Sequence, residues 1–300
     1  SLEALANSIP KNMWENQTIA LLRNRFLEPK KWSDKSIVIY CGETPMAWNP
    51  SSVYTGIGGS EEAVINISKE FTKLGYEVTV YNSCLKEGVF DGVEYLGSVR
   101  FNPRDEFNIV ISWRSNIFAY QVQAKRKIVW VHDLPKSLNL TEENTRFFDK
   151  IVVLSNYHKS LLPSFVPEEK IYISTNGITP DDFKGIEDVP REPHRIIYAS
   201  SYDRDLELIL KNWNQIREAV PDVEIHCYYG FDTFKEYIKK GILKDDGFIE
   251  RMEALFKQDG VFDRGRVGHR TLAKEYAKAS IFAYPCTYTG EINCIALTKA

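Results

Sequence analysis

The sequence lacks the features of membrane-spanning and secreted proteins. Its apolar runs are all shorter than the roughly 18 residues that a transmembrane helix needs, and no signal peptide is visible at its start. We therefore expect a cytoplasmic protein without a transmembrane segment. Ser1 is not a natural first residue, which is consistent with a segment of a longer multidomain chain.

An excess of positive charge is also absent. The 38 Lys and Arg residues face 41 Asp and Glu residues, and the net charge is −3. Nucleic-acid-binding proteins usually carry a basic surface, so the composition does not predict nucleic acid as a partner. Any anionic ligand must be held by a local group of residues.

Patterns typical of metal sites are missing as well. The five cysteines occur singly, without C-x-x-C, and no His stands at the spacing of metal ligands. Asp203 and Asp205 do form a D-x-D pattern, but a basic residue lies between them. We therefore predict no metal site and no bound cofactor.

Apolar segments that alternate with helical segments dominate the rest of the chain. A length of 300 residues suggests roughly two domains of about 150 residues each. Short apolar runs bounded by turn residues and separated by helices predict α/β domains with parallel, doubly wound sheets. We interpret 1–35 as an N-terminal extension or linker, 36–183 as a first Rossmann-like domain, 184–194 as a polar linker with two prolines, and 195–300 as a second Rossmann-like domain.

A glycine-rich segment, YTGIGGSEEAVINISKEF, follows the first apolar strand. Gly58 and Gly59 would let backbone N–H groups approach a ligand closely, and Ser60 would cap the helix after them. A nicotinamide-dependent enzyme would place its glycines directly after the strand and an acidic residue at the end of the next one. Here a long loop intervenes and the next strand ends in Asn82 and Ser83, so the pattern argues against a dehydrogenase.

The last residues, YPCTYTGEINCIALTKA, contain the most specific motif. They predict a buried strand, a turn of small residues and a helix that begins near Glu291. Such a helix N-terminus at the carboxyl end of a strand favours anions. No strand follows this helix, so the second domain is expected to be incomplete at its C-terminus.

Together with the preceding GRVGHRTLAKEYAKAS, this motif resembles the donor-sugar site of the GT-B glycosyltransferases, in particular the retaining family-4 enzymes (glycosyl transferases group 1). The resemblance covers 36–300. It implies the GT-B fold, in which two Rossmann-like domains face a cleft. It also implies transfer of a sugar from a nucleoside diphosphate sugar to a carbohydrate, glycan, lipid or protein acceptor, with retention of configuration and without a metal.

The resemblance also implies roles for individual residues. His132, at the end of KIVWVHD, and Glu291 would orient the donor sugar as catalytic residues. The residues expected to hold the donor and its diphosphate, in part through backbone N–H groups, are Gly58, Gly59, Ser201, Arg204, Gly265, Ile292, Asn293 and Cys294. A guanidinium such as that of Arg204 suits a diphosphate because it binds two oxygens at once and stays charged.

One position departs from the family pattern. Family members carry a second Glu eight positions after the first, where it binds the ribose of the nucleotide, but this chain has Lys299. Lysine accepts no hydrogen bond, so Lys299→Glu is expected to restore an acceptor. Two alternatives stay open: a catalytically inactive transferase-like binding module, and a sugar-nucleotide epimerase or hydrolase on the same fold.

Overall fold

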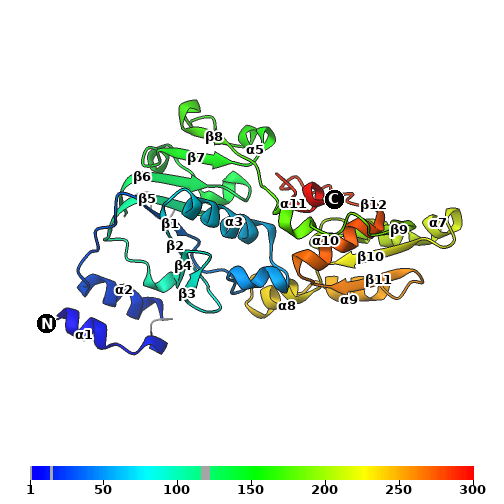
Figure 1. Cartoon of the computed structure of the whole chain (residues 1–300), viewed down its shortest axis with the longest axis horizontal. Coiled ribbons are helices and arrows are strands. Elements are labelled where there is room, and N and C mark those ends of the chain that lie inside the picture. Colours follow the sequence, from blue (N-terminus) through cyan, green and yellow to red (C-terminus); the bar gives the residue numbers. More distant parts are fainter. Residues whose placement is uncertain (1, 14–15, 116–121) are drawn as a thin grey trace. The chain divides into compact units, whose positions relative to one another are not determined.

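A computed structural model of the chain describes residues 2–13, 16–115 and 122–300 (Figure 1). Ser1, noted above as an unnatural first residue, lies outside them. The chain divides into two compact units: residues up to Pro50 together with 64–175, and 51–63 together with 176–300. Among the described residues, no helix is long and apolar enough to cross a membrane.

The first unit is built on an eight-stranded sheet with the order β3-β4-β2-β1-β5-β6-β7-β8. Only β3 runs antiparallel to its neighbour, β4, and the other described pairs are parallel. Val38 and Val129 are fully buried in central strands, as expected for a parallel sheet covered on both faces. The strands are β1 (Ser36–Tyr40), β2 (Glu77–Asn82), β3 (Gly88–Phe90), β4 (Val93–Gly97), β5 (Glu106–Trp113), β6 (Gln123–Trp130), β7 (Lys150–Val153) and β8 (Ile171–Ile173).

The N-terminal extension packs on this unit. Its second helix has an N-cap, because the Asn16 side chain accepts hydrogen bonds from the backbone of Thr18 and Ile19. Asn24 donates from this helix to the carbonyl of Phe101 over 2.8 Å. Outside the second unit, the helices are α1 (Leu2–Ser8), α2 (Gln17–Phe26), α3 (Gly59–Lys73, whose first turn belongs to the second unit), α4 (Glu142–Thr145) and α5 (Asn156–Ser160), with 3₁₀ turns η1 (Lys11–Met13), η3 (Ser98–Arg100), η4 (Pro135–Leu138) and η5 (Glu168–Lys170).

The second unit contains a four-stranded parallel sheet with the order β11-β10-β9-β12. Its strands are β9 (Glu192–Tyr198), β10 (Glu224–Tyr228), β11 (Val261–Gly265) and β12 (Ala279–Phe282). Its helices are α6 (Leu206–Lys211), α7 (Trp213–Ala219), α8 (Asp232–Lys239), α9 (Phe248–Leu255), α10 (His269–Lys278) and α11 (Ile295–Lys299), with 3₁₀ turns η2 (Pro50–Tyr54) and η6 (Pro180–Phe183).

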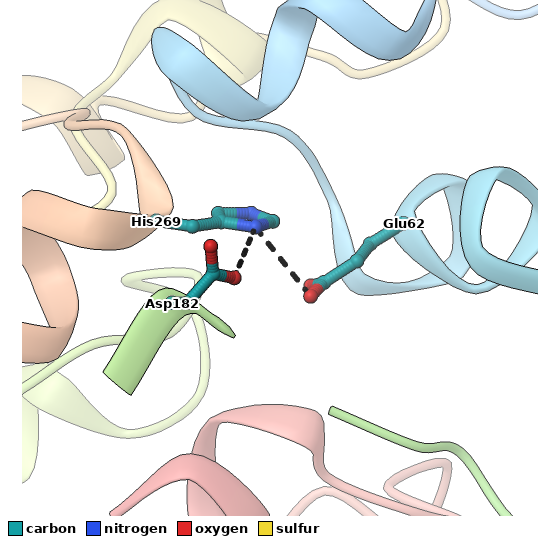
Figure 2. A group of neighbouring side chains, drawn as sticks. All are labelled: Glu62, Asp182 and His269. Atoms are coloured by element: carbon teal, nitrogen blue, oxygen red, sulfur yellow. Dashed lines mark ion pairs between the residues drawn. The ribbon is translucent and has the colours of Figure 1, made fainter. Parts of the chain in front are cut away.

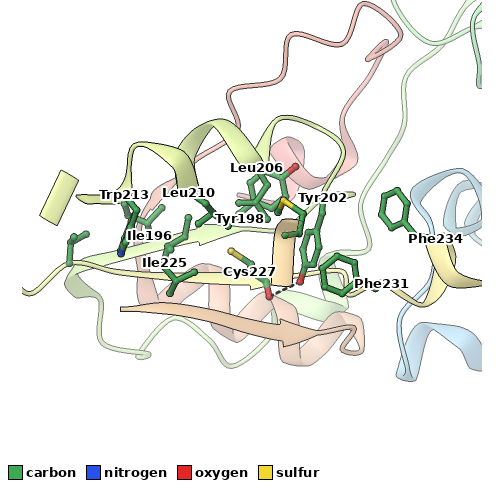
Figure 3. Close-up of a cluster of buried hydrophobic side chains, with 13 residues drawn as sticks. Ile196, Tyr198, Tyr202, Leu206, Leu210, Trp213, Ile225, Cys227, Phe231 and Phe234 are labelled. Carbon is green, nitrogen blue, oxygen red and sulfur yellow. Dashed lines mark hydrogen bonds between the residues drawn. The ribbon is translucent and has the colours of Figure 1, made fainter. Parts of the chain in front are cut away.

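A core of large side chains holds the helices of the second unit on its sheet (Figure 3). Leu206 and Leu210 of α6 are fully buried, as is Ile225 of β10. Burying each such side chain contributes about 1.5–3 kcal/mol. The hydroxyl of Tyr202 donates to Asp263 over 2.6 Å and lies 3.3 Å from the carbonyl of Cys227. This core fixes the carboxyl ends of neighbouring strands, where the loops of the candidate site begin.

The prediction of an α/β fold with parallel sheets is confirmed, although two details differ. The sequence pattern of 205–220 predicts one helix, but the segment forms two, α6 and α7, because the Asn212 side chain bonds back to Leu208 and ends the first. The chain divides after Thr175 rather than within 184–194, where β9 begins at Glu192. Polar, proline-containing segments predict turns well, but they do not by themselves locate the boundary between packed units.

Candidate functional site

The closing segment differs locally from its prediction, because α11 begins at Ile295 and not near Glu291. Glu291 instead ends a turn in which its N–H donates to the carbonyl of Tyr288 over 3.0 Å. A Cβ on Gly290 would lie 2.4 Å from the Tyr288 ring, so a larger residue there would require that ring to shift. The predicted start of the helix was therefore wrong.

Two hydrogen bonds keep the residues before α11 out of the helix. Asn176 donates from its backbone to the side-chain oxygen of Asn293 over 3.2 Å, and from its side chain to the Asn293 carbonyl over 3.1 Å. Ile292 is buried, and Cys294 is the N-cap. The first-turn N–H groups of α11 therefore belong to residues from Ile295 onward. The diphosphate contacts expected of Ile292, Asn293 and Cys294 stay a prediction.

The loop after β9 positions Arg204. The carbonyl of Ser201 accepts two hydrogen bonds that fix the turn. One comes from the Tyr198 hydroxyl over 2.7 Å and the other from the backbone N–H of Arg204 over 2.9 Å. The guanidinium pairs with Asp203 at 3.0 Å and stacks 3.9 Å from the centre of the Tyr288 ring. Burial opposes the charge, but Asp203 together with the surrounding tyrosines and Glu291 outweighs it and raises the pKa of Arg204, which stays cationic.

The loop after β12 brings Glu291 to the same place. Strands β9 and β12 are neighbours in the sheet, so their loops leave the same edge side by side. Tyr284, just after β12, donates its hydroxyl to Glu291 Oε2 and lies 3.4 Å from the hydroxyl of Ser200 in the β9 loop. Electrostatic interaction between Glu291 and Arg204 also contributes to the pKa of that guanidinium. The predicted cation and the predicted carboxylate thus lie on neighbouring loops at the same edge of the sheet.

Gly265 lies at the end of β11 with φ +64°, a left-handed conformation that glycine adopts without strain. Its N–H donates to the Asp263 carboxylate over 2.9 Å. A side chain at this position would meet nothing within 4 Å. The glycine is therefore required by the backbone turn, and its place beside the nucleotide stays a prediction.

The glycines of the glycine-rich segment belong to the second unit, which includes 51–63, whereas the sequence assigned them to the first domain. A Cβ on Gly59 would lie 3.0 Å from Ile295 of α11, and one on Gly56 would lie 2.3 Å from Cγ of Arg266. A Cβ on Gly58 would meet only the flexible Glu61 carboxylate. At Gly56 and Gly59 the missing side chain serves close packing, so these glycines have a structural role apart from any ligand.

Lys299 forms a buried ion pair that the sequence did not indicate. Its ammonium lies 2.8 Å from each carboxylate oxygen of Glu62, and the two side chains are 8% and 3% exposed. Figure 2 shows the other neighbours of Glu62: Nδ1 of His269 lies 3.5 Å from Glu62 and 3.6 Å from Asp182. The Lys299 side chain is thus paired with Glu62 of α3.

The charge states in this cluster follow from its burial. Burial, opposed by Lys299, raises the pKa of Glu62, and burial also raises the pKa of Asp182. Burial and the nearby ammonium lower the pKa of His269 to about 4, so its ring is neutral at neutral pH. Lys299 therefore compensates both carboxylates, and Arg270 also acts on Asp182.

Glu62, Asp182 and His269 also form a group that could hold a metal, with ligand atoms within 4.8 Å of one another. The Lys299 ammonium already lies at hydrogen-bond distance from Glu62, so a metal would have to displace a buried positive charge. The D-x-D aspartates do not converge either. Asp203 pairs with Arg204, and Asp205 accepts from the hydroxyl of Thr287 over 2.8 Å.

His132 lies in the first unit, directly after β6, and is 7% exposed. Its ring packs against Trp130 with 4.4 Å between ring centres. Burial, with Arg114 and His158 nearby, lowers its pKa to about 3, and its Nε2 has no hydrogen-bond partner among the described residues. The imidazole is therefore neutral, and this Nε2 is buried from solvent.

The segment that follows His132 is held rigidly. Asp133 receives two hydrogen bonds from Arg114. The buried ring of His158 accepts at Nδ1 from the backbone of Leu154 over 3.1 Å, so its Nε2 carries the proton and donates to the Asp133 carbonyl over 3.0 Å. The predicted role of His132 at a donor sugar stays a prediction.

Comparison with known proteins gives similarity in structure but not in sequence. No protein-family model and no curated protein sequence matches the chain. WaaG, a glycosyltransferase involved in lipopolysaccharide biosynthesis, is 13% identical with a TM-score of 0.53 over 88% of this chain and 78% of its own. A glycosyltransferase from Rickettsia africae is 14% identical with a TM-score of 0.52 over 81% and 71%.

HepE of Anabaena, solved in complex with UDP and glucose, is 13% identical with a TM-score of 0.51 over 84% of this chain and 74% of its own. The chain spans only 39% of the length of another match, TarM of S. aureus. At these identities the comparisons establish the fold alone. It is the GT-B fold of glycosyltransferases, as the sequence predicted.

Proposed function

We propose that the chain is a glycosyltransferase that moves a sugar from a nucleoside diphosphate sugar to an acceptor hydroxyl. The observation that carries this proposal is the arrangement of two loops, one with Arg204 and one with Glu291, that leave the carboxyl ends of the adjacent strands β9 and β12 and are linked through Tyr284. Ligands of doubly wound sheets bind at such strand ends. The likeness in fold to HepE, solved with UDP and glucose, supports the choice of donor.

Arg204 would stabilise the leaving diphosphate. When the bond between sugar and phosphate breaks, negative charge develops on the phosphate oxygens and the sugar becomes an oxocarbenium-like cation. A fixed guanidinium stabilises this developing charge. Stacking on Tyr288 and pairing with Asp203 hold Arg204 in place before the donor arrives, so little reorganisation accompanies the reaction.

Glu291 would bind the donor sugar. One of its carboxylate oxygens accepts from Tyr284, and the carboxylate can accept further hydrogen bonds from sugar hydroxyls. Correct placement of the sugar against the acceptor hydroxyl is itself a large part of such catalysis. Retention of configuration, the acceptor and the absence of a metal or other cofactor rest on the resemblance in sequence, and we propose them on that basis.

Glu291→Gln tests the sugar contact. It should weaken UDP-glucose binding by about tenfold and leave free UDP unaffected, because an amide is a poorer acceptor than a carboxylate and only the sugar-linked ligand reaches it. Titration calorimetry with both ligands measures this difference. Equal weakening of both would show that Glu291 acts on the nucleotide or on folding. GDP and ADP, free and sugar-linked, extend the measurement to other bases.

Removal of divalent metal should leave transfer unchanged. Arg204 supplies the positive charge that a metal provides in other transferases, and Lys299 already compensates the buried carboxylates near His269. Activity is measured in excess chelator and again after adding Mn²⁺ or Mg²⁺. Complete loss on chelation with recovery on metal addition would contradict the proposed mechanism.

The same assays distinguish the two rival functions. Binding of a sugar nucleotide with no turnover in the presence of varied acceptors would favour an inactive binding module. This alternative arises because Lys299 stands where family members carry a Glu. Release of UDP or an epimer without an acceptor would favour a hydrolase or epimerase on the same fold.

A further inference from the structure

Tyr284 links the two loops of the proposed donor site. It follows β12, and its hydroxyl donates to Glu291 Oε2 while lying 3.4 Å from the hydroxyl of Ser200, which follows β9. Burial and the bond to Glu291 raise the pKa of the Tyr284 hydroxyl far above its ordinary value. The phenol therefore keeps its proton and remains a donor to the carboxylate.

We propose that Tyr284 is a positioning residue that orients the Glu291 carboxylate toward the donor sugar. The inference rests on the proposed function and extends it to a residue that the sequence motif does not mark. Its ring is itself fixed, since it packs against Tyr198 and Phe282 with ring centres 6.0 and 5.8 Å apart. A fixed ring leaves its hydroxyl only one position, and this position in turn selects one orientation of Glu291.

This positioning matters because the backbone hydrogen bonds near Glu291 fix its main chain but do not orient its carboxylate. The residue lies in a turn before α11, where a carboxylate is free to take several orientations. A hydrogen bond from a buried phenol restricts it to one of them. Tyr284 uses one lone pair of Oε2, which leaves Oε1 as the less engaged oxygen to accept from a sugar hydroxyl.

Tyr284→Phe removes the hydroxyl and keeps the ring. It should weaken UDP-glucose binding by up to about tenfold, no more than the Glu291→Gln change through which it acts, and leave UDP binding unchanged. Tyr276→Phe is the matched control. Its ring is also buried in the second unit, but its hydroxyl has no hydrogen-bond partner among the described residues, so this change should affect neither ligand.

A double-mutant cycle with Glu291→Gln decides whether Tyr284 acts through that carboxylate. If it does, the double variant should bind UDP-glucose about as weakly as Glu291→Gln alone, because the tyrosine then has nothing to orient. Additive losses would overturn the inference and leave the proposed function intact. Unchanged UDP-glucose binding in Tyr284→Phe would also overturn it, and unchanged binding in Glu291→Gln would overturn the sugar contact itself.

Thermal unfolding of each variant separates binding from folding. If Tyr284→Phe does not fold, Ser200→Ala provides the second test, because it removes the other hydroxyl that contacts Tyr284. This variant should weaken UDP-glucose binding in the same direction by a smaller factor. Wild-type affinity for UDP-glucose in Ser200→Ala would then count against the proposal that Tyr284 links the loops after β9 and β12.

Discussion

Lys299→Glu is expected to destabilise the second unit by about 3–5 kcal/mol, the usual cost of breaking a buried ion pair. The substitution removes the ammonium that lies 2.8 Å from both oxygens of Glu62 and places a second carboxylate beside the first. Neither side chain is more than 8% exposed, so water screens the repulsion poorly. The midpoint of thermal unfolding should fall by on the order of 10 °C, since 1 kcal/mol corresponds to about 2–4 °C in a domain of this size.

The reversed pair is the sharpest test of this expectation. Adding Glu62→Lys to Lys299→Glu restores opposite charges at the same two positions and should recover a large part of the lost stability. Lys211→Glu is the control, because Lys211 pairs with Glu207 at 2.9 Å on the exposed side of α6. Such a surface pair is worth about 1 kcal/mol or less, so the control should unfold close to the wild-type temperature.

The sequence alone leads to a different expectation for Lys299→Glu. There the new carboxylate restores an acceptor at the ribose position and tightens nucleotide binding. In the structure, the same change first creates a buried repulsion with Glu62. Tighter UDP binding without loss of stability would therefore show that Lys299 does not pair with Glu62 in solution, and that position 299 does face the nucleotide.

The fold could be predicted from the sequence because it depends on local patterns. Apolar runs such as 36–40 and 224–228 are bounded by turn residues and separated by helices, and this alternation has one common solution, a parallel sheet covered by helices. The start of α11 could not be predicted in the same way. It is set by hydrogen bonds between Asn176 and Asn293, which are distant in sequence and carry no local signal.

In the candidate site, too, residues with a local sequence signal could be predicted and residues that depend on distant partners could not. Arg204 and Glu291 follow strands that are adjacent in the sheet, so a motif at each strand end was enough to indicate both. Glu62 was missed because its partner, Lys299, is 237 residues away. A signal was nevertheless present: a lysine in the place of a buried acid requires a compensating anion nearby. Tyr284 was missed because it continues an apolar strand, where an aromatic residue is typical of the core.

Arg204→Ala is expected to lower kcat/KM by about 2–4 kcal/mol of transition-state stabilisation, or about 30-fold to 1,000-fold. The reason is that the leaving diphosphate gains charge as the sugar departs, and Arg204 is a cation that the β9 loop fixes against Tyr288, next to the loop that carries Glu291. An interaction that strengthens in the transition state affects kcat more than substrate binding. Steady-state kinetics with UDP-glucose should therefore show the larger change in kcat.

The control for Arg204 is Arg217→Ala. Arg217 is exposed to a similar degree, 28% against 26%, and also pairs with an aspartate, Asp259, at 2.6 Å, but it lies on α7 away from both loops. Its removal should leave kcat/KM unchanged. Arg204→Lys should give an intermediate rate, because an ammonium keeps the charge and loses the planar fork that binds two phosphate oxygens at once. Wild-type kinetics in Arg204→Ala would show that Arg204 only forms a surface ion pair with Asp203. The positive charge that stabilises the leaving group would then have to come from another part of the chain.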